Sequence, residues 1–293
     1  MRYDIRLRLS YDYQRPVGDA RHLVRVQPRD LPGVQQVQDL KLRIDPAPSE
    51  RGAFEDFFGN PVLSVALRPQ HEALDVEMRA QVRVERGSQP DLDLSPDLDG
   101  LRAELASLRS LAPDAPCHFL PPSQRAPTLP RIAAYARASL QGAGSVLAVV
   151  HDLGHRLRND FSYDSDATEV DTQVGEAFDM RAGVCQDFSH IMIAGLRGLG
   201  IPAGYVSGFL RTIPPPGQPR LEGADATHAW VRAWCGVQMG WREFDPTNGI
   251  PAGDDHITIA YGRDYADVPP IAGVLKTTGE QTATQAVDVI PLE

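Results

Sequence analysis

The sequence predicts an α+β protein in which an N-terminal antiparallel β-sandwich domain precedes a domain of helices followed by a sheet. Apolar and polar residues alternate with a period of two over most of the first ninety residues. Helical spacing then takes over, before the period of two returns. At roughly 100–200 residues per domain, the 293 residues suggest two domains. We expect a β domain over residues 1–90, a linker over 91–100 and a second domain over 101–293.

The clearest predicted strand opens the chain. Its apolar residues alternate with polar ones and give the strand one buried and one solvated side; they are Tyr3, Ile5, Leu7 and Leu9. The same pattern returns in four further stretches, at residues 22–26, 34–44, 62–68 and 73–85. Pro, Gly and Asp residues separate these stretches, which is typical of an antiparallel sandwich. We find no chemical motif in this domain.

The composition then shifts. Residues 87–100 (GSQPDLDLSPDLDG) are rich in Pro, Gly and Asp and predict the linker. Helical spacing follows in four stretches, at residues 101–111, 129–141, 145–158 and 183–199. The last helix is ended by Gly200 and Pro202. Four short strands with a period of two come next: GYVSGFL, THAWVRAWC, WREFDPT and HITIAY.

Composition and charge exclude several classes of protein. The formal net charge of −10 argues against nonspecific nucleic-acid binding, which depends on Lys and Arg. Three cysteines cannot form a disulfide framework, because one must stay unpaired. No run of 18 apolar residues could span a membrane, and the start lacks a signal-peptide apolar stretch. We therefore expect a soluble, cytoplasmic protein. No nucleotide-binding glycine motif occurs, and we expect no cofactor and no metal.

Cys185 follows Gly183 and Val184 at the predicted first turn of the 183–199 helix. A helix N-terminus favours negative charge, so a nucleophilic thiolate is well placed there. The following apolar residues, at helical spacing, would bury the helix against a sheet. A free cysteine is also often just a small buried apolar residue, and position alone does not separate the two interpretations.

His228 opens the predicted strand THAWVRAWC, and Asp245 ends the next strand, WREFDPT. The register between the strands decides whether the two side chains meet. A connecting loop of two or four residues puts Asp245 on the face of His228, diagonal to it, whereas an odd loop puts it on the other face. A thiol at a helix start, then a histidine and an acid on neighbouring strands, is the order of a nucleophile, a base and the group that orients it.

Two segments carry a family resemblance: RAGVCQDFSHIMIAGLRGLGIPAGYVSGFL (181–210) and ATHAWVRAWCGVQMGWREFDPTNG (226–249). They resemble the catalytic core of the transglutaminase-like superfamily. The chain is more closely similar to the bacterial transglutaminase-like enzymes and cysteine proteases with an N-terminal β domain, through FEDFFGNPV (54–62) and YGRDYADVPPIAGV (261–274). GVCQDF, THAW and FDPTNG, in this order and spacing, are the specific part of the match.

The resemblance implies a papain-like, transglutaminase-like α+β core with Cys185 as nucleophile, His228 as base and Asp245 as orienter. Tyr163 and Gln186 are the candidates for a second oxyanion donor. We expect a cysteine peptidase or amidase that hydrolyses an amide of a peptide or protein through a thioester. The alternatives are a protein-glutamine acyltransferase and a non-catalytic binding module with the same fold. The sequence says nothing about the oligomeric state.

Two other motifs suggest metals. His151 and His155 stand at i and i+4, as in zinc proteases, but Asp152 replaces the usual glutamate and Gly154 lies between the histidines. The run DLDLSPDLD (91–99) offers oxygen ligands but lacks the glycine and final glutamate of a calcium loop. We favour a polar helix face for the first motif and a solvated linker for the second.

The remaining polar residues are given structural interpretations. We expect Cys117 and Cys235 to be buried and inert, because their spacing does not resemble a redox pair. His190 lies about 140° around the helix from Cys185 and should point away from it. Arg263 and Asp264 match the family's tail. Residues 159–180 and 211–225 should shape the substrate cleft.

Overall fold

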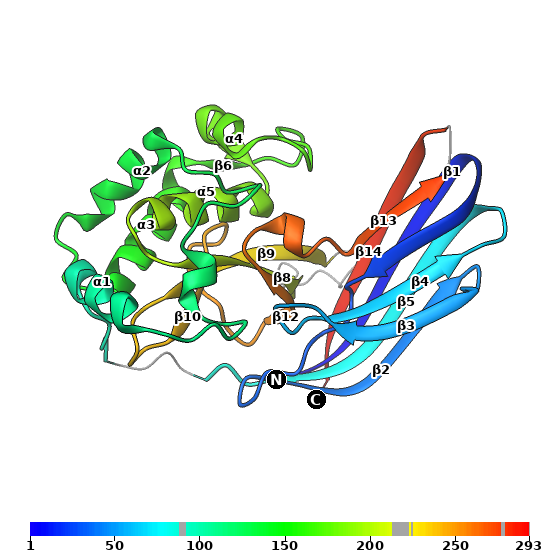
Figure 1. The fold of residues 1–293 in the computed structure, drawn as a ribbon, viewed down its shortest axis with the longest axis horizontal. Coiled ribbons are helices and arrows are strands. Elements are labelled where there is room, and N and C mark those ends of the chain that lie inside the picture. The colour runs from blue at the N-terminus through cyan, green and yellow to red at the C-terminus, as the bar shows by residue number, and fades with distance from the viewer. Residues whose placement is uncertain (88–91, 213–222, 224, 277–278, 293) are drawn as a thin grey trace, which may run out of the picture.

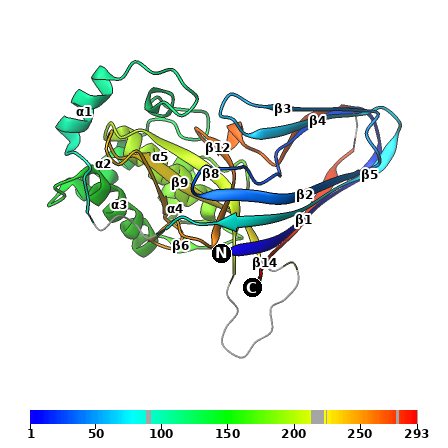
Figure 2. The ribbon, with the colours of Figure 1, turned by 90° about the horizontal axis from the view of Figure 1, so that it is seen from below.

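The computed structural model describes residues 1–87, 92–212, 223, 225–276 and 279–292. An antiparallel sheet domain lies beside a domain in which helices cover a second sheet (Figure 1). The five-stranded second sheet lies between the helices and the first sheet, as the view from below also shows (Figure 2). The predicted fold class, α+β with an N-terminal antiparallel β domain, is confirmed.

The N-terminal sheet is built around one long, bent strand. Its strands are β1 (Arg2–Val24), β2 (Gln35–Asp45), β3 (Glu50–Glu55), β4 (Pro61–Leu67) and β5 (His71–Val84), joined by β13 (Ile271–Lys276) and β14 (Gln281–Leu292). The first half of β1 pairs with β5 and β14, and its second half pairs with β4 and β13. The register shifts between Asp12 and Val17, and Asp19 has a positive φ of 51°. This bend turns the antiparallel strands into a half-barrel.

The predicted alternation sets the inner face of this domain. Tyr3, Ile5, Leu7 and Leu9 are each at most 4% exposed. Asp4 lies between two of them and is also buried, and both its oxygens accept hydrogen bonds from Arg79 at 3.0 Å.

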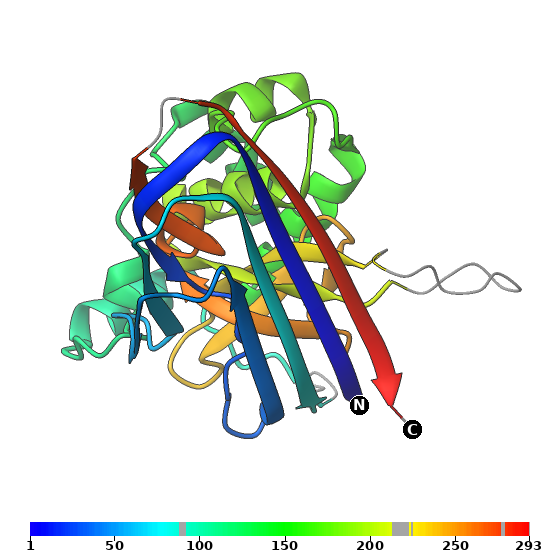
Figure 3. The ribbon, with the colours of Figure 1, turned by 90° about the vertical axis from the view of Figure 1, so that its right-hand side faces the viewer.

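The end of the chain belongs to this sheet, although we expected residues 101–293 to form one unit. β14 runs along β1 with Val289 opposite Ile5 and Val287 opposite Leu7, and both valines are buried (Figure 3). The polar–apolar alternation of 281–292 completes the apolar face that β1 presents at its free edge. A pairing between the first and last strands has no local signal in the sequence.

The second domain contains all four predicted helical stretches. Its helices are α1 (Leu98–Ser107), α2 (Pro130–Arg137), α3 (Val146–Asp160), α4 (Val174–Met180) and α5 (Cys185–Gly198), with 3₁₀ turns at Pro116–Phe119, Ala138–Leu140 and Tyr265–Asp267. The short α4 was not predicted. α1 begins within the expected linker, because the Asp97 carboxylate accepts the Gly100 N–H at 2.7 Å and caps the helix. None of the described helices is long and apolar enough to cross a membrane.

The second sheet has the strand order β11-β10-β9-β8-β12. Its strands are β8 (Ala203–Leu210), β9 (Ala226–Trp234), β10 (Trp241–Asp245), β11 (Ile250–Pro251) and β12 (His256–Gly262). The two edge strands, β11 and β12, follow each other directly in the chain. The sheet therefore curves until its edges approach each other. α5 packs on β9 and β8, and the short strands β6 (Ser162–Tyr163) and β7 (Ala182–Gly183) pair in parallel just before it.

Two side-chain amides of the N-terminal domain pair with the outer edge of β12. Gln35 donates to the Thr258 carbonyl at 2.7 Å and accepts from the Thr258 N–H at 2.8 Å. Asn60 makes the same pair of bonds with Tyr261, both at 2.8 Å. The amides satisfy backbone groups that another strand would otherwise satisfy, and so they fix the two domains against each other.

Candidate active site

The start of α5 is held rigidly around Cys185. The Asp187 carboxylate accepts the Val184 N–H at 2.9 Å and the Thr168 hydroxyl at 2.6 Å, which ties the helix start to the preceding loop. Gly183 is required here, because a Cβ would lie 2.5 Å from an Asp187 carboxylate oxygen. Cys185 is the first helical residue and is half-buried.

The backbone N–H of Cys185 is one of the unpaired donors of a helix start. It donates to no acceptor within the part of the chain that the structure describes. Tyr163, opposite Gly183 in the β6–β7 pair, is 59% exposed. Partial burial raises the pKa of the Tyr163 hydroxyl, and the charge of Cys185 raises it further. The Gln186 side chain instead donates to the Val170 carbonyl at 3.1 Å.

The register of β9 and β10 brings His228 and Asp245 together. Trp241 lies directly opposite Trp234, and six residues separate the two strands. This even spacing puts Asp245 on the same face as His228, which is the first of the two registers considered above. His228 Nε2 lies 2.7 Å from Asp245 Oδ2. The other ring nitrogen, Nδ1, is left for the thiol.

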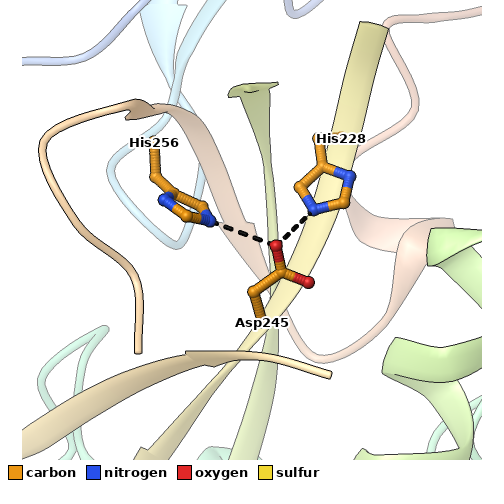
Figure 4. Close-up of side chains that lie close together, drawn as sticks. All are labelled: His228, Asp245 and His256. Atoms are coloured by element: carbon orange, nitrogen blue, oxygen red, sulfur yellow. Dashed lines mark hydrogen bonds and ion pairs between the residues drawn. The ribbon is translucent and has the colours of Figure 1, made fainter. Parts of the chain in front are cut away.

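Asp245 is fully buried and accepts five hydrogen bonds. Oδ2 accepts from His228 and, at 3.2 Å, from His256 Nε2 (Figure 4). It also accepts from the Asn248 side chain at 2.7 Å. Oδ1 accepts the backbone N–H groups of Thr247 and Asn248 at 2.9 and 3.2 Å. Burial alone would raise the pKa of Asp245, but these hydrogen bonds outweigh it and hold the pKa well below its usual range.

His228 shows the opposite shift. Burial lowers its pKa, but the hydrogen bond to Asp245 and the interactions with Cys185 outweigh burial and raise the pKa to about 10. The sulfur of Cys185 therefore lies beside the ring. The three elements α5, β9 and β10 thus bring a thiol, an imidazole and a carboxylate into one group.

His256 and Asn248 belong to this group, and neither was predicted from the sequence. The Gly253 N–H donates to His256 Nδ1 at 3.1 Å, so the proton of His256 sits on Nε2 and is donated to Asp245. No periodicity reveals His256, because β12 is separated from β9 by β8 and reaches Asp245 only through the curvature of the sheet. The turn sequence after Asp245 could have suggested Asn248, since Asx side chains often bond nearby groups in turns.

Trp230 packs against the ring of His228. It is fully buried, its ring stacks against His228 with centroids 6.1 Å apart, and its Nε1 donates to Glu243 at 2.6 Å. Gly208 on the neighbouring strand makes room for it, because a Cβ there would lie 2.4 Å from the indole. The position of His228 therefore depends on packed, hydrogen-bonded neighbours.

The residues considered as metal ligands have other partners. Among the described residues, the only group of three close candidate ligands is His228, Asp245 and His256. The protonated Nε2 of His256 cannot bind a metal while it donates to Asp245. His151 and His155 pack their rings against Phe244 at 5.2 and 5.4 Å.

Gly154, between those two histidines, also has a packing role: a Cβ would lie 2.1 Å from the ring of Phe244. In the 91–99 run, Asp93 accepts from Ser95 and Ser145 and Asp97 caps α1. Residue 91 lies outside the described residues. These acidic side chains are therefore occupied by local hydrogen bonds.

The other two cysteines differ from each other. Cys235 is buried, and burial raises its pKa to about 12. Cys117 is exposed, so the expectation that both would be buried was wrong for this residue. The sulfur of Cys117 lies 3.7 Å from the Ser110 carbonyl oxygen.

The remaining candidates brace the fold. His190 points away from Cys185, as expected, and accepts the Tyr265 N–H at 3.2 Å. Asp264 caps the last 3₁₀ turn and accepts the Arg125 N–H, and Arg263 pairs with Asp267. Of the two expected cleft loops, 159–180 contacts the start of α5 through Thr168 and Val170. Most of 211–225 lies outside the described residues.

Comparisons with known proteins find relatives of both parts of the chain. The sequence-family model of the bacterial transglutaminase-like N-terminal region matches residues 3–83. The family model of the transglutaminase-like superfamily matches residues 133–246. An uncharacterized protein of Mycobacterium tuberculosis (strain ATCC 25618 / H37Rv) is 36% identical over 269 residues, covering 86% of this chain and 81% of the relative. One of Mycobacterium leprae (strain TN) is 30% identical over 288 residues, covering 97% and 96%.

A solved structure has the same fold. It is described as a "Putative Cysteine Protease" from Cytophaga hutchinsonii and superposes with a TM-score of 0.73 and 23% identity, covering 100% of this chain and 91% of that one. With family-model matches in both domains and relatives 30% and 36% identical over 97% and 86% of its length, the chain belongs to the transglutaminase-like superfamily and carries the bacterial transglutaminase-like N-terminal region.

Proposed function

We propose that the protein is a thiol-dependent hydrolase of amide bonds in peptides or proteins, with Cys185, His228 and Asp245 as its triad. Membership of the superfamily supports a thiol-dependent enzyme in general. The observation that carries the finer proposal is the buried 2.7 Å bond from His228 Nε2 to Asp245, which leaves Nδ1 for Cys185 at the helix start.

The reaction begins with attack of the Cys185 thiolate on the amide carbonyl. A carbon–sulfur bond forms, and the carbonyl oxygen becomes an oxyanion that accepts the Cys185 N–H. Tyr163 is our candidate for the second donor, because the charge of Cys185 acts on its hydroxyl and raises its pKa, and because it lies opposite Gly183 just before the helix start. The Gln186 side chain is a weaker candidate, because it is bonded to Val170.

Collapse of the intermediate breaks the carbon–nitrogen bond. The His228 imidazolium gives its proton to the leaving amine, and a thioester remains on Cys185. His228 then takes a proton from water as the water oxygen attacks the thioester; the carbon–sulfur bond breaks, and a carboxylic acid and the Cys185 thiolate are released beside the His228 imidazolium, which restores the starting pair. Asp245, held by its five donors, keeps the imidazole in the required tautomer and orientation throughout.

We propose water as the acceptor because it is the default one. Transfer of the acyl group to an amine, as in a transglutaminase, uses the same thioester. The experiment below distinguishes the two acceptors. We also propose a reducing compartment such as the cytoplasm, because all three cysteines are free thiols and the mechanism needs one of them reduced.

The test is to trap the acyl-enzyme. The protein is incubated with a peptide library and quenched in acid, and adducts are located by mass spectrometry. We expect an acyl adduct on Cys185 that disappears with time as a free acid is released. The variant Cys185→Ala should form no such adduct. Consumption of the adduct by added amine in preference to water would favour the acyltransferase. Absence of any adduct on Cys185 across the library would favour a binding module.

A further inference from the structure

A cleft of about 580 Å³ lies between the two domains, away from Cys185. Its walls come from both parts of the chain, including Phe58 and Arg86 on one side and Trp241 and Tyr261 on the other. This volume lies within the range of small-molecule sites in proteins, roughly 300–1,000 Å³. The proposed chemistry at Cys185 does not use this cleft.

The cleft is positively charged, although the whole chain is acidic. Four arginines line it, together with two carboxylates: Arg29, Arg86, Arg232 and Arg242 with Asp114 and Glu243. The formal net charge of the chain is −10. A local excess of cations in such a chain, within low-dielectric walls, focuses a field that attracts anions.

Arg232 is the most buried of these arginines, at 5% exposed. Its guanidinium lies over the rings of Phe119, Trp241 and Tyr261, at 4.4, 4.3 and 4.3 Å from their centroids. Burial lowers its pKa to about 10. Within the described part of the chain it makes no hydrogen bond or close ion pair, and its Nε is buried without a partner. Aromatic faces hold this cation, but no contacting carboxylate neutralises it.

The nearest buried carboxylate already has its partners. Glu243 accepts hydrogen bonds from Arg86 at 2.8 Å, from Trp230 at 2.6 Å and from Tyr261 at 2.8 Å. Two further lining arginines, Arg29 and Arg242, also have a buried Nε that lacks a partner among the described residues. Three guanidinium groups around one cleft thus each have a buried Nε–H without an acceptor among the described residues, although Arg29 also donates through Nη1 to the Phe58 carbonyl and to Asn60.

We propose that this interdomain cleft binds a small oxyanion, a carboxylate or a phosphate, through Arg232, Arg242 and Arg29. Guanidinium groups suit both ligands, because their planar N–H pairs match the oxygens of carboxylate and phosphate. The aromatic walls at Phe58 and Trp241 accommodate an apolar body attached to the anionic group.

The cleft is connected to the active site through one strand. His228, Trp230 and Arg232 share a face of β9, and Trp230 links the ring of His228 to Glu243. An anion held at Arg232 would therefore lie along the face that positions the histidine. Its binding is still separate from the triad chemistry and can be measured without turnover.

The test is calorimetric titration of the full-length protein with inorganic phosphate and, separately, with malonate, at constant ionic strength set by chloride. We expect saturable binding of at least one anion. Binding of phosphate alone, or of malonate alone, would identify the ligand's anionic group. Arg242→Gln should weaken that binding by about tenfold, the factor that corresponds to loss of one charge-assisted hydrogen bond.

Arg137→Gln is the matched control, because Arg137 is exposed at the end of α2 and the substitution changes the charge equally. It should bind like the wild type. Arg29→Gln supplies a second test from the other domain, and circular dichroism checks that each variant is folded. Absence of saturable binding of both anions to the wild type would overturn the proposal. Equal affinities of Arg242→Gln, Arg29→Gln and the control would also overturn it.

Discussion

Replacing His256 by phenylalanine should weaken the hold on Asp245 without emptying the space that the ring fills. The lost bond to Asp245 is 3.2 Å long, against 2.7 Å for the bonds from His228 and Asn248, so we place its contribution at about 1.5 kcal/mol, the low end for a charged acceptor. The Gly253 N–H also loses its acceptor, at a cost of about 1 kcal/mol. We expect the free energy of unfolding to fall by about 2.5 kcal/mol.

The assay is urea denaturation at neutral pH, combined with the alkylation rate of Cys185 in the folded protein. That rate should fall by about tenfold, because weakening Asp245 by about 1.5 kcal/mol loosens the orientation of His228. His151→Phe is the matched control: His151 also packs on an aromatic ring, at 5.2 Å from Phe244, but has no hydrogen-bond role in the site. Wild-type stability and alkylation in His256→Phe would refute the assignment of His256 as a positioning residue.

Two further predictions concern pH and packing. The pKa of His228 is raised to about 10 in the folded state, so the stabilising contribution of His228 is complete below pH 6.5 and is lost as the pH rises toward 10. The pKa of Asp245 is lowered in the folded state, so the contribution of Asp245 is lost as the pH falls below the usual pKa of an aspartate. His228→Phe should therefore remove part of the alkaline loss seen in pH-dependent denaturation of the wild type, and superimposable curves would contradict this. Gly154→Ala should cost about 1–3 kcal/mol by forcing α3 off β10. Gly52→Ala, whose Cβ meets nothing within 4 Å, is the control, and equal stabilities would refute the packing argument.

The positions of site residues within their own strand or helix could be predicted from the sequence, because they follow from alternation and from helix-start signals. The alternation of THAWVRAWC predicted the strand that carries His228, and the helix signals put Cys185 at a helix start. The pairing with Asp245 stayed open, because it depends on whether the turn holds an even or odd number of residues. The structure has six, and the turn is closed by a bond from the Cys235 N–H to the Gly240 carbonyl at 2.9 Å.

The features that could not be predicted from the sequence are contacts between residues far apart in the chain. His256 reaches Asp245 because the sheet curves until its edge strands approach each other, and no alternation within β12 shows that. β14 joins β1 across the whole length of the chain. The sequence shows Gly154 only as a departure from the zinc-protease pattern, whereas in the structure the absence of its Cβ makes room for the Phe244 ring, from a strand about ninety residues later.

The central claim is that His228 activates the thiol of Cys185. It is tested most directly by the rate of iodoacetamide alkylation of Cys185 at neutral pH. Because Cys117 is exposed and would react as well, the measurement is made in a Cys117→Ser background, in which Cys235 is buried. We predict that Cys185 reacts faster than the same cysteine in urea-unfolded protein, and that His228→Phe slows it by at least about tenfold. A folded-state rate no faster than the unfolded one, and unchanged by His228→Phe, would contradict the account.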